Sequence, residues 1–126
     1  MATELFPIIS TPDLPRSISF YQNLLGGTVT YDFAGPDGDP AYVSLSIGSS
    51  SLGIAIDPSM SDAAQVPPGP IALWIYVDDC ERTVELLRSA GVRVTAEPEL
   101  QPWGERIARI LDPDGNEVII GSRAAG

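Results

Sequence analysis

The sequence predicts an α+β fold of two βαβββ modules, with eight strands in a mixed sheet and flanking helices. Three observations predict it. The second half of the chain repeats the first at an offset of 66 positions, each half carries one helical and four strand-like segments, and a stretch with four prolines separates the halves. Each half is too small to be a separate domain. We therefore expect a single domain over residues 1–126, with module one at 1–57, a linker at 58–70 and module two at 71–126.

Each module begins with an apolar strand that is followed by a helix. The apolar runs cover residues 6–11 and 71–77. Asp13 and Asp79 follow them at corresponding places, where a side-chain oxygen caps the first turn of a helix. Helical patterns come next and end at glycines, the usual residues just past a helix; these patterns cover residues 14–25 and 80–90.

Three further strand-like runs follow each helix. Residues 112–116, Asp-Pro-Asp-Gly-Asn, have the composition of a hairpin loop between the last two runs, and residues 48–51 have the same role in module one. The strand-like runs lie at 28–33, 42–47 and 52–56 in module one and at 93–97, 106–111 and 117–121 in module two.

Composition and charge exclude several classes of function. The chain has seven arginines, no lysine and 17 acidic residues, which gives a net charge of −10. Nucleic-acid binding and adhesion to anionic membranes need basic surfaces, so we expect neither kind of partner. No histidine is present, which excludes histidine-dependent catalytic triads, histidine general bases and imidazole metal sites.

The chain has a single cysteine, Cys80, so an internal disulfide and a thiolate metal cluster are excluded. Cys80 lies at the start of a helix, but no base accompanies it, and we do not expect it to be catalytic. The first residues lack the basic and apolar regions of a signal peptide, and no window approaches the roughly 20 apolar residues of a membrane span. We therefore expect a cytoplasmic protein.

Several local motifs resemble those of one superfamily. Residues 13–14 (Asp-Leu) with 19–21 (Ser-Phe-Tyr) and 25–26 (Leu-Gly) are similar to its first-module helix signature. The second-module counterpart is matched by 77–79 (Val-Asp-Asp) with 90–92 (Ala-Gly-Val), and the closing hairpin by 103–106 (Trp-Gly-Glu-Arg) with 112–116. In this order, over essentially the whole chain, they resemble the vicinal oxygen chelate superfamily of glyoxalases, bleomycin resistance proteins and extradiol dioxygenases. The resemblance implies that the eight strands form a cup-shaped mixed sheet.

Enzymes of this superfamily hold a divalent metal in the cup, with ligands from the first and fourth strands of each module. The corresponding positions in this chain are Phe6, Ala72 and Ile119, with a fourth on or near Ile54. None of these side chains offers a donor for a divalent cation. The resemblance therefore implies no metal and no other cofactor. It points to the metal-free branch, whose members are mainly drug-binding homodimers.

Alternation along the strands predicts a ligand site in the cup. Aliphatic residues on one face suit packing against the helices, whereas the other face carries rings and hydroxyls, which are typical of a site for a flat aromatic molecule. Trp74 and Tyr76 have an alternative role as core residues, and Trp103 is either a lid over the site or a dimer contact. The predicted ligand-binding residues are Phe6, Ile8, Ser10, Tyr42, Ser44, Ser46, Ala72, Trp74, Tyr76, Trp103, Glu117 and Ile119.

These inferences lead to a non-catalytic protein that sequesters an aromatic natural-product antibiotic, neutral or cationic, and so gives resistance. By analogy with the superfamily, the candidate drugs are bleomycins, mitomycins, quinoxalines and anthraquinone-fused enediynes. One alternative is a metal-independent enzyme of the lyase or isomerase type, with Tyr42, Tyr76, Glu105 or Glu117 as acid or base. Another is a protein that binds a common metabolite such as a flavin. Converging titratable groups with shifted pKa values would favour the enzyme.

Overall fold

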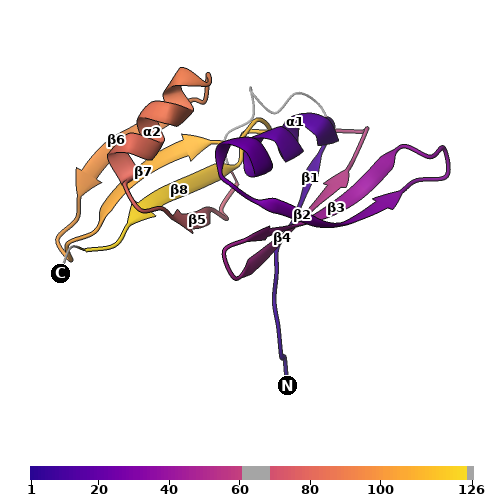
Figure 1. Cartoon of the computed structure of the whole chain (residues 1–126), viewed down its shortest axis with the longest axis horizontal. Helices are drawn as coiled ribbons and strands as arrows, with labels where there is room; N and C mark the ends of the chain where they lie inside the picture. Colours follow the sequence, from indigo (N-terminus) through magenta and orange to yellow (C-terminus); the bar gives the residue numbers. More distant parts are fainter. Residues whose placement is uncertain (61–68, 125–126) are drawn as a thin grey trace. The chain divides into compact units, whose positions relative to one another are not determined.

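The computed structural model describes residues 1–60 and 69–124. The chain divides into two compact units, Met1–Asp62 and Ala63–Gly126, which are described one at a time. Each unit contains a four-stranded mixed sheet with its helical segment between the first and second strands (Figure 1). The predicted α+β class and the repeated βαβββ order are confirmed. The pairing of both modules in one cup-shaped domain stays a prediction, and residues 61–68 of the predicted linker lie outside the described residues.

In unit 1 the strands lie in the order β1-β4-β3-β2, with β1 parallel to β4 and the other neighbours antiparallel. The first strand is shorter than the predicted run at 6–11, because its pairing with β4 begins only at Ile8. The elements are β1 (Ile8–Thr11), α1 (Leu14–Ile18), a π-helical segment η1 (Ser19–Leu24), β2 (Thr28–Ala34), β3 (Pro40–Ile47) and β4 (Ser50–Ile56).

The single helix predicted at 14–25 is thus divided between α1 and η1. The amide of Leu25 donates to the carbonyl of Phe20, five residues earlier, at 3.2 Å, which is the wide turn of a π-helix. Phe20 and Tyr21 are consecutive, yet both are buried, and their ring centroids lie 4.8 Å apart. Successive side chains on a regular α-helix point about 100° apart. The wide turn therefore accompanies the burial of two neighbouring rings.

In unit 2 the strand order is β5-β8-β7-β6, with β5 parallel to β8 and the rest antiparallel. The first strand is again shorter than predicted, and the strand predicted at 93–97 continues to Leu100. The elements are β5 (Leu73–Tyr76), α2 (Cys80–Ser89), β6 (Val94–Leu100), β7 (Arg106–Leu111) and β8 (Glu117–Ser122).

The two aspartates cap the helices as predicted. The Asp13 carboxylate accepts a hydrogen bond from the Arg16 amide, and the Asp79 carboxylate accepts one from the Arg82 amide, both at 3.1 Å. Each bond satisfies one of the amides that the first turn leaves without a helical partner. The cap fixes where each helix begins and therefore how it lies on its sheet.

One face of each sheet is covered by the helical segment of the same unit. In unit 2, α2 packs against β6, β7 and β8 through buried residues that include Val84 and Leu87. Ile110 and Ile120 are fully buried on the face of the sheet that α2 covers. Each such side chain contributes roughly 1.5–3 kcal/mol by leaving water.

The loop at 112–116 is the hairpin turn that the sequence predicts. The Asp112 carboxylate accepts hydrogen bonds from the amides of Asp114 (2.9 Å) and Asn116 (2.8 Å) and from the Asn116 side chain (2.9 Å). Gly115 adopts a φ of +85°, which favours glycine. These bonds hold β7 and β8 in register at the end of the sheet where Glu117 begins β8.

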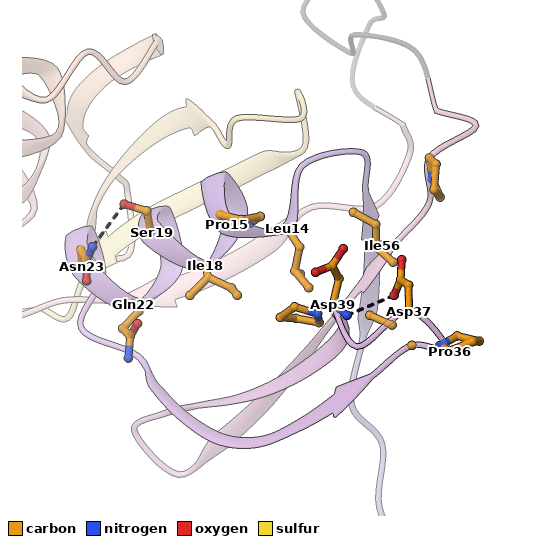
Figure 2. Close-up of a pocket in the computed structure, with 14 residues that line it drawn as sticks. Leu14, Pro15, Ile18, Ser19, Gln22, Asn23, Pro36, Asp37, Asp39 and Ile56 are labelled. Carbon is orange, nitrogen blue, oxygen red and sulfur yellow. Dashed lines mark hydrogen bonds between the residues drawn. The ribbon is translucent and has the colours of Figure 1, made fainter.

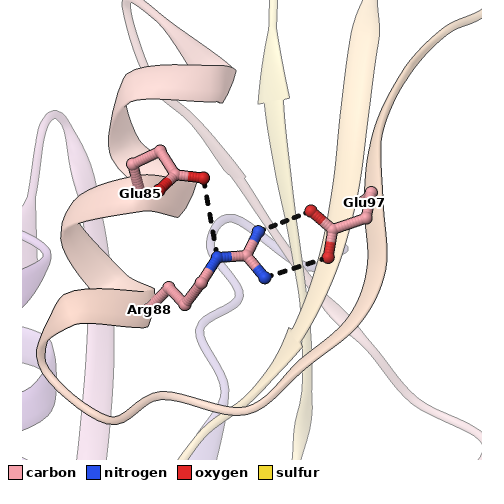
Figure 3. Close-up of polar contacts among 3 residues, drawn as sticks. All are labelled: Glu85, Arg88 and Glu97. Carbon is pink, nitrogen blue, oxygen red and sulfur yellow. Dashed lines mark hydrogen bonds and ion pairs between the residues drawn. The ribbon is translucent and has the colours of Figure 1, made fainter.

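The end of α2 is joined to β6 by an arginine. The Arg88 guanidinium donates to both carboxylate oxygens of Glu97, and its Nε lies 3.5 Å from the Glu85 carboxylate (Figure 3). The hydrogen bonds between these two side chains lower the pKa of Glu97 and raise the pKa of Arg88. The group is exposed, so it orients the helix end more than it stabilises the unit.

Candidate functional site

The uncovered face of the unit 2 sheet carries the predicted aromatic residues. Strand pairing places Trp74 beside Ile119 and Tyr76 beside Gly121, so these four residues share a face. Ile75 is paired with Ile120 on the face that α2 covers. Trp74 and Tyr76 are 42% and 43% exposed, so neither fills the core of unit 2 as the structure describes it.

Trp74 lies against the backbone of β8 because Gly121 has no side chain. A Cβ atom at Gly121 would lie 3.0 Å from the indole Nε1 and 3.2 Å from two ring carbons of Trp74. The neighbouring Tyr76 ring is 5.8 Å from the Trp74 ring, centroid to centroid, at an angle of 56°. The glycine therefore lets the indole rest on the sheet with part of its surface open to a ligand.

Glu105 joins Trp103 to these rings. Its carboxylate accepts a hydrogen bond from the Trp103 indole at 2.7 Å. Hydrogen bonding with Glu105 raises the pKa of the Tyr76 phenol above its ordinary value; partial burial and the Glu105 charge add to the rise, and Arg123 opposes it. We call Trp74, Tyr76, Trp103 and Glu105 the aromatic cluster.

Arg123 lies over one face of the Tyr76 ring, with its guanidinium carbon 3.9 Å from the ring centroid. This is a cation–π contact between a planar cation and the phenol ring. No sequence pattern predicts this contact, because Arg123 follows the last strand and no periodicity relates it to Tyr76. The sequence predicts Glu105 only as a candidate acid or base, yet its carboxylate accepts a hydrogen bond from the Trp103 indole and raises the pKa of Tyr76.

Other predicted residues on this sheet have definite partners. Glu117 forms an ion pair with Arg109 on β7, and its side chain is 25% exposed. Ile119 lies between this pair and the aromatic cluster on the same face and is 8% exposed. Ala72 precedes β5 and is exposed.

In unit 1 the predicted residues also share the uncovered face. Ile8 and Ser44 are both paired with Gly53, so they lie on one side of the sheet. The Tyr42 hydroxyl lies over Gly53, where a Cβ atom would come within 2.6 Å of it. Ser10 alternates with Ile8 along β1, and Ser46 donates a hydrogen bond to the carbonyl of Gly48 at 3.2 Å.

Two aromatic residues of this face were missed. Tyr31 and Phe33 on β2 are paired with Ser44 and Tyr42, and they are 56% and 57% exposed. Their spacing of two residues in the run at 28–33 is the signal that could have found them. Phe6 precedes β1 and is 45% exposed.

The strand register identifies the fourth position of the metal comparison, which the sequence places on or near Ile54. Ile54 is paired with Val43, and both are buried on the face that the helical segment covers. The fourth-strand position on the uncovered face is Gly53, which is also 66 residues before Ile119. Of the positions on or near Ile54, the register therefore selects Gly53, because a shift of one residue reverses the face.

The four positions that correspond to metal ligands in the superfamily, with Gly53 as the fourth, do not fit a divalent metal. Gly53, Ala72, Ile119 and Phe6 provide no side-chain donor. No group of three acidic or cysteine side chains suited to a metal occurs within residues 1–60 and 69–124. The same ranges contain no helix that is long and apolar enough to cross a membrane.

Cys80 is a structural residue in unit 2. Its side chain is 1% exposed and its thiol donates to the carbonyl of Ile120 at 3.4 Å. Burial raises the pKa of Cys80, and the charges of Glu81 and Asp79 act in the same direction. A buried thiol that holds its proton is a poor nucleophile.

Comparison with known proteins gives one consistent result. A model of the glyoxalase/bleomycin resistance protein/dioxygenase superfamily matches residues 5–120. A bleomycin resistance protein from Klebsiella pneumoniae is 25% identical over 139 residues, which cover 96% of this chain and 98% of that protein.

Solved structures share the fold. A bleomycin-binding protein in complex with bleomycin has a TM-score of 0.67 at 22% identity, with 97% of this chain and 99% of that chain covered. A fosfomycin resistance protein from Listeria monocytogenes has a TM-score of 0.75 at 15% identity, with 98% and 96% covered. Since the family match spans nearly all of both βαβββ units, this chain belongs to the glyoxalase/bleomycin resistance protein/dioxygenase superfamily.

Proposed function

We propose that this chain is a non-catalytic binding protein that sequesters an aromatic natural-product antibiotic and thereby gives resistance. The observation that carries the proposal is the aromatic cluster, in which the half-exposed Trp74 and Tyr76 lie side by side on an uncovered sheet face. Glu105 accepts a hydrogen bond from the exposed Trp103 indole and raises the pKa of Tyr76. Rings offer stacking surfaces, and a few fixed polar groups orient the bound molecule. The bleomycin resistance protein among the relatives supports an antibiotic as the ligand.

The ligand that suits this cluster is planar and carries positive charge. Arg123 already rests on Tyr76 as a planar cation, and Glu105 places a negative charge beside Tyr76 and Trp103. The net charge of −10 attracts cations from a distance. Bleomycin-type glycopeptides meet these requirements best among the candidate drugs, which also include mitomycins, quinoxalines and anthraquinone-fused enediynes.

The titratable groups of the cluster favour binding over catalysis. The raised pKa of Tyr76 keeps its phenol protonated at neutral pH, so it is a poor general base. Glu105 is already engaged by the Trp103 indole. The structural similarity to a fosfomycin resistance protein keeps a metal-independent enzyme as the second candidate, with Glu117 as its acid or base.

We expect the binding form to be a cytoplasmic, metal-free homodimer. The uncovered sheet faces of both units expose large apolar side chains, including Ile8, Phe33 and Trp74. Pairing with a second copy would cover such surfaces and complete a pocket around the rings. Light scattering that gives a particle of 13.4 kDa at micromolar concentration would remove the dimer from the proposal.

Titration with bleomycin, mitomycin C, echinomycin and riboflavin tests the function. Quenching of tryptophan fluorescence and calorimetry measure binding, and mass spectrometry of the same mixtures detects any product. We expect tight binding of at least one antibiotic with the compound recovered unchanged. Turnover would establish the enzyme instead, and preferential binding of riboflavin would establish a flavin-binding protein.

Two variants connect such binding to the aromatic cluster. Trp74→Ala removes a ring of the cluster. Leu86→Ala is its matched control, because Leu86 is a 64% exposed apolar side chain on α2. We expect the first variant to lose affinity and the second to keep it.

A further inference from the structure

Unit 1 contains a cavity that none of the predicted ligand-binding residues lines. Its volume is about 770 Å³, within the range of small-molecule sites. It lies between the helical segment, the β2–β3 loop and the end of β4 (Figure 2). Leu14 and Ile18 form one wall, and Pro40 and Ile56 contribute apolar surface from the sheet.

The cavity is on the opposite side of the unit 1 sheet from the uncovered aromatic face. Ala41 lines it, and Ala41 alternates with Tyr42 along β3. Ile56 likewise shares its face with Ile54, which is buried on the covered side, because the two are separated by two positions along β4. A molecule in this cavity would therefore leave Tyr42 and Ser44 untouched.

The polar groups of the cavity are mainly acidic. Asp37 and Asp39 belong to the β2–β3 loop and both line the cavity (Figure 2). Asp37 accepts the Asp39 amide at 3.0 Å and so shapes the loop. Within residues 1–60 and 69–124, neither carboxylate forms an ion pair. The sequence of unit 1 has seven acidic side chains and one arginine, so the surrounding field is negative.

We propose that this cavity is a second binding site, which takes a small organic cation with an apolar body, such as a hydrophobic amine. The apolar body fills the space between the α1–η1 wall and Ile56, and the ammonium group lies near Asp39. Both carboxylates are exposed to water, so an ammonium group gains a partly solvated ion pair with one of them. The negative field repels an anion, and a neutral molecule gains only apolar contact. The site is separate from the aromatic cluster and does not depend on the antibiotic proposal.

Dansylcadaverine tests this site, because it joins an apolar fluorophore to a primary ammonium group. Its N-acetyl derivative has the same body without the charge. Fluorescence titration of the whole chain at low salt gives the affinity for both probes. We expect the amine to bind about three-fold tighter than the acetylated probe, which is the scale of a partly exposed ion pair, and 0.5 M NaCl to reduce this preference.

Substitutions locate the site. Asp39→Asn should abolish the preference for the amine and leave the affinity for the acetylated probe unchanged. Asp32→Asn is the matched control, because it removes an exposed carboxylate of β2 that does not line the cavity. Ile18→Trp fills the cavity and should weaken both probes about ten-fold or more.

The outcomes are distinguishable from failure of the antibiotic proposal. Because the fused ring of the probe also suits the aromatic cluster, both titrations are repeated in Trp74→Ala. The preference for the amine, and its loss on Asp39→Asn, should persist in that variant; absence of the preference there would place the ammonium group in the aromatic cluster and overturn the second site. Equal effects of Asp39→Asn and Asp32→Asn, or unaltered binding by folded Ile18→Trp, would also overturn it. If Ile18→Trp does not fold, the comparison of the two aspartate variants decides alone.

Discussion

Replacement of Trp74 by alanine is the strongest test of the aromatic cluster. The indole is 42% exposed, so of the 150–250 Å² that an aromatic side chain offers, roughly 100 Å² remains for a ligand to cover. At about 25 cal/mol per Å² this area is worth roughly 2.5 kcal/mol. Ring stacking adds about 0.5–1.5 kcal/mol, and ordering of the bound groups removes a similar amount.

The expected loss is therefore about 2–3 kcal/mol, or about 30- to 150-fold in Kd. Calorimetry with bleomycin or the tightest-binding member of the drug panel measures it. Because about half of the ring surface is already in contact with the free protein, unfolding should become easier by only about 1.5–2.5 kcal/mol, half the cost for a fully buried tryptophan.

Ile120→Ala supplies the comparison. Ile120 is fully buried beneath α2, so its truncation should cost about 2–5 kcal/mol of stability and leave the affinity of the folded fraction unchanged. Chemical denaturation and calorimetry on both variants separate the two effects. If Trp74→Ala unfolds the protein and its surviving folded fraction binds as tightly as the original chain, Trp74 is a core residue and the cluster is not the site.

Four further predictions concern single contacts. Glu105→Gln should lower the pKa of Tyr76, which Glu105 now raises; alkaline titration of tyrosinate absorbance, with Tyr76→Phe as the blank, measures it. The stability that this raised pKa contributes is present below pH about 10 and is lost as the pH rises through the folded-state value. The stabilities of Glu105→Gln and the original chain should therefore converge in alkali, and a difference that stays constant with pH would contradict the link. Arg88→Ala should raise the pKa of Glu97, which NMR titration measures. In the original chain the lowered pKa of Glu97 contributes stability above pH about 4.3, and this contribution is lost as the pH falls through the folded-state value. The stabilities of the original chain and the variant should therefore converge in acid. Gly121→Ala should push the Trp74 indole outward, because the new Cβ would lie 3.0 Å from the ring. Tryptophan emission should shift to the red, and drug binding should weaken about five-fold, or about 1 kcal/mol. An unmoved emission maximum would count against the contact. Elemental analysis should find no stoichiometric divalent metal, and one zinc, nickel, iron or manganese per chain would overturn the comparison of the ligand positions.

The repeat carries most of what the sequence predicts about the fold. The offset that aligns Asp13 with Asp79 also aligns the helices and strands, and both aspartates cap helices. Local patterns suffice for this, because caps and strand alternation depend on neighbouring residues. The wide turn at η1 was missed because it depends on the burial of Phe20 and Tyr21 together, which is a tertiary requirement.

The candidate site was predictable only where alternation determines it. Trp74 and Tyr76 lie on the expected face because β5 is a regular strand. The roles of Glu105 and Arg123 depend on how a loop and the chain end return to the sheet, and no local pattern encodes that return. Sequence alone left the fourth metal position on or near Ile54, since one residue in a strand exchanges its two faces and only the pairing selects Gly53.

The Arg123 guanidinium already occupies one face of the Tyr76 ring, so a ligand must compete with it for that face. Any cation that stacks on that ring face must first displace Arg123, so its gain is only the difference between two similar contacts. A simple amine gains almost nothing by this exchange. An extended planar molecule gains more, because it covers Trp74 and Trp103 as well. If the aromatic cluster is the binding site, we therefore expect Arg123 to disfavour common small cations and to favour broad aromatic ones.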